Sequence, residues 1–238
     1  MKLGVRLREL SEKRLKRRTL GRWLARPELR ARVEQVLSLE PDALGVRGGA
    51  LDPRALPGNP EFKKAGWTEH MLLRYCLAME HAQGKEVLDT CCGFGWGAYL
   101  VSAVAARVIA VDFDDGALEF CRRQWAAANA SFIKASVLEL PFEAARFDVV
   151  MCMEAIEHFT PSDGRRYLGE LSRVCKPGGV LLGSSAFPET RREADALCQT
   201  NEHHLYIYTR AELRSLLGEH FFRPFRLTAH YFGAIKRR

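Results

Sequence analysis

The chain has 238 residues, of which 47% are hydrophobic and 27% are charged, and its formal net charge is +7. A chain of this length and composition is expected to fold as one sizeable globular domain with an appendage. It contains no run of 18 apolar residues and no apolar core near its basic N-terminus, so we expect neither a membrane span nor a signal peptide. The seven cysteines form no C-x-x-C pair, which argues against a zinc knuckle or a disulfide framework and predicts reduced thiols in a cytoplasmic protein.

The positive charge is concentrated at the N-terminus. Residues 1–40 hold 12 Lys or Arg and 5 Asp or Glu, which accounts for the whole net charge. Apolar side chains at helical spacing predict one or two helices, with stripes at Leu3, Leu7 and Leu10 and at Val33, Val36 and Leu37. The segment either attaches to an anionic partner, such as a lipid surface, a lipid-linked glycan or RNA, or packs on the domain by its leucines. Attachment to lipid would make the protein peripheral at a membrane.

Residues 41–66 contain four prolines and five glycines and are predicted to be an irregular linker, so that 1–66 precede a domain formed by 67–238. Beyond the linker, helical and strand patterns alternate. The expected helices cover residues 68–82, 96–105, 117–128, 161–174 and 211–219, and the expected strands cover 86–89, 108–112, 131–135, 147–153, 180–184 and, as a β-like tail, 226–234. This alternation predicts an α/β fold whose mostly parallel, doubly wound sheet is covered by helices on both faces.

The stretch EVLDTCCGFGWGAYL, residues 86–100, is predicted to be a strand, a glycine-rich turn and the start of a helix. Such a turn exposes backbone N–H groups to a ligand that must approach closely, and glycine is needed because a Cβ would hold the ligand away. The spacing Gly93-x-Gly95-x-x-Ala98 also fits a dinucleotide-binding fingerprint, so the turn alone leaves the ligand open.

The segments after the turn narrow the choice of ligand. Asp112 follows Asp89 by 23 residues and ends the second strand, where a carboxylate can accept hydrogen bonds from ribose hydroxyls. Phe113 can lie against a purine face, and the third strand is followed by Ser136 and Val137. All these positions are expected beyond the carboxyl ends of the strands, where open α/β sheets bind their ligands.

Four ordered motifs, VLDTCCGFG, VIAVDFD, LPFEAARFDVVMCMEAIEHF and RVCKPGGVLLGS, resemble those of the class I S-adenosylmethionine-dependent methyltransferases, over about residues 67–233. The resemblance implies a Rossmann-like fold and S-adenosylmethionine as cofactor. Within that class the chain is similar to the type 11 set, which includes members associated with glycan assembly. The G-x-G-[YW]-G loop is matched by residues 93–97, and residues 201–209 look similar to N-P-x-H-x-x-x-Y-[ST], with Glu202 in place of the proline.

The resemblance also implies roles for individual residues. The methionine end of the cofactor would be held by Asp89 and the backbone of Cys91, Gly93 and Gly95, the ribose by Asp112, the adenine by Phe113, Ser136 and Val137, and the sulfonium side by Met153. Two positions depart from the family. Cys91 replaces the first loop glycine, which is tolerable if φ is not positive there, and an acid often found at Ser136 is missing.

The leading hypothesis is methyl transfer to a small-molecule or glycan acceptor, with a hydroxyl as the acceptor group. His158 or His204 is the candidate general base, although His158 could instead make a structural hydrogen bond at a helix start. Candidate substrate contacts are Asn201, His203 and Tyr206. We do not expect a metal ion on Glu154, Glu157 and His158, because two carboxylates and a histidine within five residues rarely form a site alone.

Three other functions are compatible with parts of the sequence. An RNA methyltransferase could use the basic N-terminus as a phosphate anchor. However, the segment at the end of the fourth strand reads Met153-Glu154-Ala155-Ile156 and not N-P-P-[YF]. An NAD-dependent dehydrogenase is disfavoured because Asp89 lies four residues before Gly93. A non-catalytic cofactor-binding module is disfavoured by the intact acids and glycines.

Overall fold

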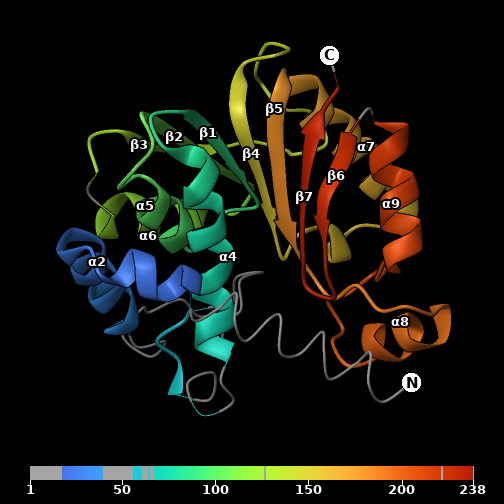
Figure 1. Cartoon of the computed structure of the whole chain (residues 1–238), viewed down its shortest axis with the longest axis horizontal. Coiled ribbons are helices and arrows are strands. Elements are labelled where there is room, and N and C mark those ends of the chain that lie inside the picture. Colours follow the sequence, from blue (N-terminus) through green and yellow to red (C-terminus); the bar gives the residue numbers. More distant parts are fainter. Residues whose placement is uncertain are drawn as a thin grey trace.

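The structure is a computed structural model that describes residues 18–39, 56–60, 64, 67–125, 127–220 and 222–237. Within these residues a seven-stranded sheet has the order β3-β2-β1-β4-β5-β7-β6 (Figure 1). The strands are β1 (Glu86–Thr90), β2 (Arg107–Asp112), β3 (Ala130–Lys134), β4 (Phe147–Met153), β5 (Cys175–Ser184), β6 (Phe222–Leu227) and β7 (Tyr231–Lys236). The first five are parallel and β7 runs antiparallel to both β5 and β6. The predicted α/β fold with a mostly parallel sheet is confirmed.

Helices cover both faces of the sheet. On one face lie α2 (Pro27–Leu37), α4 (Trp67–Ala82), α5 (Trp96–Val101) and α6 (Asp115–Gln124), and on the other lie α7 (Pro161–Val174) and α9 (Arg210–Glu219). Alternation along β1 separates the two cores, because Val87 packs with the α4 side and Leu88 with the α7 side. Burying a side chain of this size contributes roughly 1.5–3 kcal/mol.

Several predicted boundaries are wrong. The helix expected over 96–105 ends at Val101, and the helix expected over 117–128 ends at Gln124, where the indole N–H of Trp125 donates to the Phe94 carbonyl at 2.6 Å. The β-like tail is a hairpin of two strands, because the Thr228 hydroxyl accepts from the Tyr231 N–H and folds the chain back. The helix α8 (Arg191–Cys198), which begins with a Thr190–Glu193 capping box, was not predicted.

The described N-terminal residues pack on the domain. Trp23, Val33 and Val36 are buried in the same core as α4 and α5. Arg32 donates to the Ser102 hydroxyl at 2.7 Å, and its guanidinium lies 4.5 Å from the centre of the Tyr99 ring. Packing by apolar side chains is therefore confirmed for residues 18–39, whereas residues 1–17 and most of the predicted linker lie outside the described residues.

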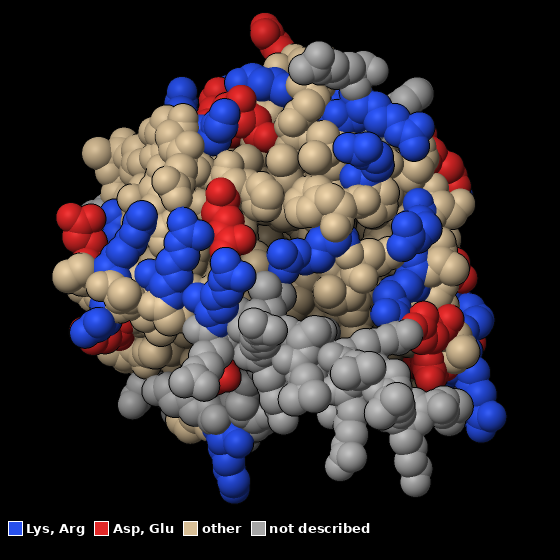
Figure 2. Space-filling model, viewed as in Figure 1, with Lys and Arg blue, Asp and Glu red and all other residues tan. Residues whose placement is uncertain are grey.

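Basic side chains remain on the outer side of this segment. The exposed arginines are Arg18, Arg22, Arg26 and Arg30. Figure 2 shows Lys and Arg gathered over the part of the surface where α2 lies. The segment therefore combines an apolar inner side with a cationic outer side.

The contact between α4 and α5 depends on a glycine. A Cβ at Gly97 would lie 1.9 Å from the Tyr75 ring, whereas a Cβ at Gly218 in α9 would meet nothing within 4 Å. We predict that Gly97→Ala lowers the free energy of unfolding by about 1–3 kcal/mol through overpacking. The control Gly218→Ala should raise it by about 0.5–1 kcal/mol, because alanine is the better helix former. Urea unfolding measures both changes, and equal effects of the two variants would contradict the packing argument.

Candidate functional site

The carboxyl ends of the parallel strands form one continuous edge. Asp89 lies at the end of β1, Asp112 ends β2 and Met153 ends β4, where it pairs with Ser184 of β5. The chain runs from β1 outward to β2 and β3 and then returns to β4 on the other side of β1, so the order of the strands reverses between β1 and β4. Ligands of open α/β sheets bind beyond such a reversal. At about 4.8 Å between strands, the edge from β3 to β4 spans about 14 Å, enough for an extended nucleoside ligand.

The turn after β1 folds through three residues with positive φ, which are Cys91 (54°), Gly93 (53°) and Gly95 (66°). The condition under which cysteine would be tolerable in place of the family's glycine, a φ that is not positive, is not met at Cys91. A side chain in the left-handed region costs roughly 1–2 kcal/mol, so the turn keeps a strained backbone that the family's glycine would relax. Cys91 packs against the core on the α7 side, and that contact offsets part of the cost.

The rest of the turn approaches its neighbours closely. A Cβ at Gly95 would lie 2.6 Å from both the Cys121 sulfur and the Phe132 ring. The Cys121 thiol donates to the Gly93 carbonyl at 3.3 Å. These contacts explain why the position after Phe94 is glycine, and they hold the backbone of the turn against α6 and β3.

Asp112 fixes the turn from the neighbouring strand. Its Oδ2 accepts from the Gly93 N–H at 2.8 Å, and its Oδ1 accepts from the N–H groups of Phe113 (2.8 Å) and Asp114 (3.1 Å). The residue is 4% exposed. A carboxylate offers about four acceptor positions and three are filled, so Oδ2 keeps the capacity to accept from a hydroxyl.

Asp89 is the most unusual group at this edge. It is 1% exposed, and neither carboxyl oxygen has a hydrogen-bond partner among the described residues. Burial first, and then the charge of Asp112, raise the pKa of Asp89 to about 8, while Arg74 opposes the shift. An unpaired buried carboxyl is costly unless a cation or a donor meets it, so this position is suited to an ammonium group.

Arg74 of α4 was not identified from the sequence. Its guanidinium pairs with Glu154 at 2.9 Å and donates to the Ser184 hydroxyl at 3.4 Å, and its side chain is 10% exposed. It therefore joins α4 to the ends of β4 and β5 and brings positive charge near Asp89. A single arginine on a helix gives no sequence signal of this kind, because most helical arginines are solvated.

The residues predicted to border the adenine lie at the β2 and β3 end of the edge. Phe113 is 66% exposed, Ser136 is exposed, and Val137 is 7% exposed and belongs to the core. The Ser136 hydroxyl accepts from the Leu138 N–H at 3.3 Å. Met153 is 6% exposed at the other end of the edge.

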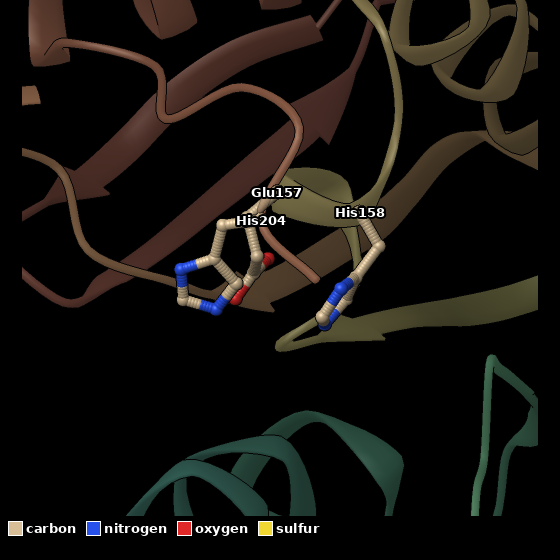
Figure 3. Close-up of side chains that lie close together, drawn as sticks. All are labelled: Glu157, His158 and His204. Carbon is tan, nitrogen blue, oxygen red and sulfur yellow. The ribbon is translucent and has the colours of Figure 1, made fainter. Parts of the chain in front are cut away.

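The two candidate base residues lie side by side although 45 residues separate them in the sequence. The His158 and His204 ring centres are 5.4 Å apart (Figure 3). His158 is exposed in η3 (Ile156–His158) and donates from Nδ1 to the His203 carbonyl at 2.9 Å. His204 accepts at Nε2 from the Asn201 amide nitrogen at 3.1 Å, and burial followed by the proximity of His158 lowers its pKa.

Glu157 holds this arrangement together. Its backbone carbonyl accepts from the N–H groups of Leu205 (2.8 Å) and Tyr206 (3.2 Å), which ties the segment before α9 to the end of β4. Its side chain is buried, and burial followed by the charge of Glu154 raises its pKa to about 8. Glu154 itself pairs with Arg74.

The other candidate substrate contacts have internal partners. Asn201 orients His204, and the Tyr206 hydroxyl donates to Glu212 at 3.1 Å while Arg191 lies 4.5 Å from the centre of its ring. His203 is exposed.

Two further sequence expectations concern the whole chain. None of the seven cysteines forms a disulfide, and no helix in the described ranges is long and apolar enough to span a bilayer.

The sequence profile of a methyltransferase domain matches residues 87–179, which run from β1 into β5. Residues 87–179 thus match the methyltransferase domain family. A relative from Mycolicibacterium smegmatis named as a probable S-adenosylmethionine-dependent methyltransferase is 32% identical over 145 residues, which are 61% of this chain and 52% of the relative. A fatty-acid O-methyltransferase of the same organism is 32% identical over 126 residues, covering 49% of this chain and 45% of the relative.

The chain spans about half the length of the curated relatives it matches. Among solved structures, the YcgJ protein of Bacillus subtilis superposes with a TM-score of 0.60 at 17% identity, over 69% of this chain and 98% of YcgJ, and supports the fold. The family and the fold imply S-adenosylmethionine as cofactor. The residues present fit it, because its amino group can meet the unpartnered Asp89 carboxyl and its ribose the open acceptor position of Asp112.

The raised pKa of Asp89 predicts pH-dependent ligand binding. Below about pH 8 this carboxyl is protonated in the free protein, and it must release the proton to pair with an ammonium group. The affinity for S-adenosylhomocysteine should therefore rise between pH 6 and 8, approaching tenfold per pH unit. Calorimetry in buffers of different ionisation enthalpy should detect the released proton. Asp89→Asn should abolish this dependence and the control Asp115→Asn, at an exposed position, should retain it; a flat wild-type profile would refute the assignment.

Proposed function

We propose that this chain transfers a methyl group from S-adenosylmethionine to an oxygen atom, in the first instance a hydroxyl, of a small-molecule or glycan acceptor. The observation that carries the proposal is the buried, unpartnered Asp89 beside a glycine turn that Asp112 holds from the next strand. S-adenosylmethionine supplies an electrophilic methyl group on a sulfonium. The protein then has to bind, orient and exclude water, and positioning alone can lower a barrier by about 7–11 kcal/mol.

Each end of the cofactor has proposed partners along the strand edge. Asp89 and the backbone of Cys91, Gly93 and Gly95 would hold the methionine end, Asp112 the ribose, Phe113, Ser136 and Val137 the adenine, and Met153 the sulfonium side. From β3 through β2 to β1, these positions meet the adenine, the ribose and the methionine end in the order in which the cofactor joins them.

A base beside the acceptor would make a hydroxyl a better nucleophile, an effect typically worth ~10²–10⁴ in rate. His204 is the better candidate of the two histidines. The amide of Asn201 keeps a proton away from Nε2, and the lowered pKa keeps the ring neutral near pH 7. His158 uses Nδ1 to donate to a backbone carbonyl, which agrees with the structural role considered from the sequence.

Two observations bear on the class of acceptor and partner. The relative named as a fatty-acid O-methyltransferase supports oxygen as the acceptor atom and adds lipid-like acceptors to those worth testing. The exposed arginines of residues 18–30 would favour an anionic lipid surface, and thus a peripheral membrane location for an otherwise cytoplasmic protein. RNA is the weaker alternative, because Trp23, the aromatic residue between these arginines, is buried and cannot stack on bases.

The proposal predicts a methylated oxygen and a defined effect of His204. The chain, given isotopically labelled S-adenosylmethionine, should label hydroxylated glycans, small alcohols or fatty acids, and mass spectrometry should place the label on oxygen. His204→Ala should lower kcat by ~10²–10⁴ with little change in cofactor affinity. His220→Ala serves as the control, because His220 lies at the end of α9 against α7. Label on RNA alone would contradict the acceptor class, and an unchanged kcat for His204→Ala would contradict the base.

A further inference from the structure

We propose that Glu157, His158 and His204 form a binding site for one divalent transition-metal ion of the Zn²⁺ type. One carboxylate oxygen and one ring nitrogen from each histidine all lie within 4.8 Å of one another. Figure 3 shows the three side chains pointing toward a common space, two from the segment after β4 and one from the stretch before α9. No element contributes all three, and the two segments are held together by the bonds from the N–H groups of residues 205 and 206 to the Glu157 carbonyl and by the bond from His158 to the His203 carbonyl.

A second observation independently points to a missing cation. The Glu157 residue is 2% exposed, and its Oε2 has no hydrogen-bond partner within the described part of the chain. A buried carboxylate oxygen without a donor is expensive, and coordination to a metal is one of the ways in which proteins compensate such a group. Glu154 is not available for this role because it pairs with Arg74.

His158 is oriented as a metal ligand usually is, whereas the buried Nδ1 of His204 has no hydrogen-bond partner among the described residues. His158 donates from Nδ1 to the His203 carbonyl, which fixes the ring and leaves the Nε2 lone pair free. Metal-bound histidines commonly donate their second ring N–H to such a carbonyl. For His204, Asn201 plays the ordering role: its Oδ1 accepts from the His203 N–H at 3.0 Å, so its amide nitrogen faces Nε2 and that nitrogen stays unprotonated. A bound ion would displace this one hydrogen bond.

The donor set selects the class of metal. Two imidazoles and one carboxylate suit Zn²⁺ and neighbouring transition metals, whereas Mg²⁺ and Ca²⁺ prefer oxygen ligands. Three protein ligands leave a coordination position open, as in catalytic rather than structural zinc sites. Because His158 is exposed, that position is reached from solvent.

The ion would also give this site a chemical use. At its open coordination position the ion would bind the acceptor hydroxyl and lower the pKa of that hydroxyl. The ion would then replace His204 as the group that activates the acceptor. This use rests on the proposed methyl transfer, whereas ion binding does not, so the two can fail separately.

The test is a titration of the full, chelator-treated chain with Zn²⁺ against a chromophoric competitor, and in parallel with Mg²⁺. We expect one Zn²⁺ per chain at this site and no comparable Mg²⁺ binding. His158→Gln, at an exposed position, and the near-isosteric Glu157→Gln should each weaken Zn²⁺ at least tenfold while circular dichroism shows an unchanged fold. His220→Ala should bind as the wild type does.

Substitution with Co²⁺ provides a spectroscopic check of the ligands. Bound Co²⁺ should show visible absorption bands that both the His158→Gln and Glu157→Gln variants lose or shift. Zn²⁺ binding that both variants retain at wild-type strength, or the absence of any saturable Zn²⁺ binding by the wild type, would overturn the proposal. Neither readout requires turnover or cofactor binding, so a failure of the proposed function would leave this result interpretable.

Discussion

The site depends on two carboxylates buried at the tips of neighbouring strands. Asp112 satisfies its charge with three backbone N–H groups and thereby pulls the Gly93 turn toward β2. Asp89, one strand away, has no such partners and lies close enough for the charge of Asp112 to raise its pKa. Asp112 thus holds the turn, whereas Asp89 has no hydrogen-bond partner among the described residues. A cationic group bound beside Asp89 would be stabilised more strongly than the same group in water.

The reversal of strand order between β1 and β4 places a second group of residues beside the acid pair. Glu154, Glu157 and His158 follow Met153, the last residue of β4, and the segment before α9 brings His204 to them. Arg74 of α4 connects the two regions through Glu154 and Ser184. The proposed cofactor side and the proposed acceptor side are therefore adjacent, and α4 and the segment before α9 fix their relative position.

The fold could be predicted from local sequence patterns. The site could be predicted only in part, because it also depends on contacts between distant segments. The strand Phe147–Met153 and the helix Pro161–Val174 were predicted to the residue, because a buried apolar run and a Thr-Pro helix start are local signals. The acids and glycines were correctly placed at the strand ends and in the turn, because their spacing reflects adjacent parallel strands. The contacts of Arg74 and the proximity of Glu157 to His204 could not be predicted, since they depend on how distant segments meet. The positive φ of Cys91 contradicts the usual preference of its residue type.

The central claim is that these two acids hold an S-adenosyl ligand, and calorimetric titration with S-adenosylhomocysteine tests it most directly. The wild type should bind one equivalent, and Asp112→Ala should weaken binding by more than ~1.5 kcal/mol, because a hydrogen bond to a charged group exceeds an ordinary one. Removing the ribose hydroxyls from the ligand should cost the wild type a similar amount and the variant little. Wild-type affinity in Asp112→Ala, or no binding by the wild type, would contradict the account.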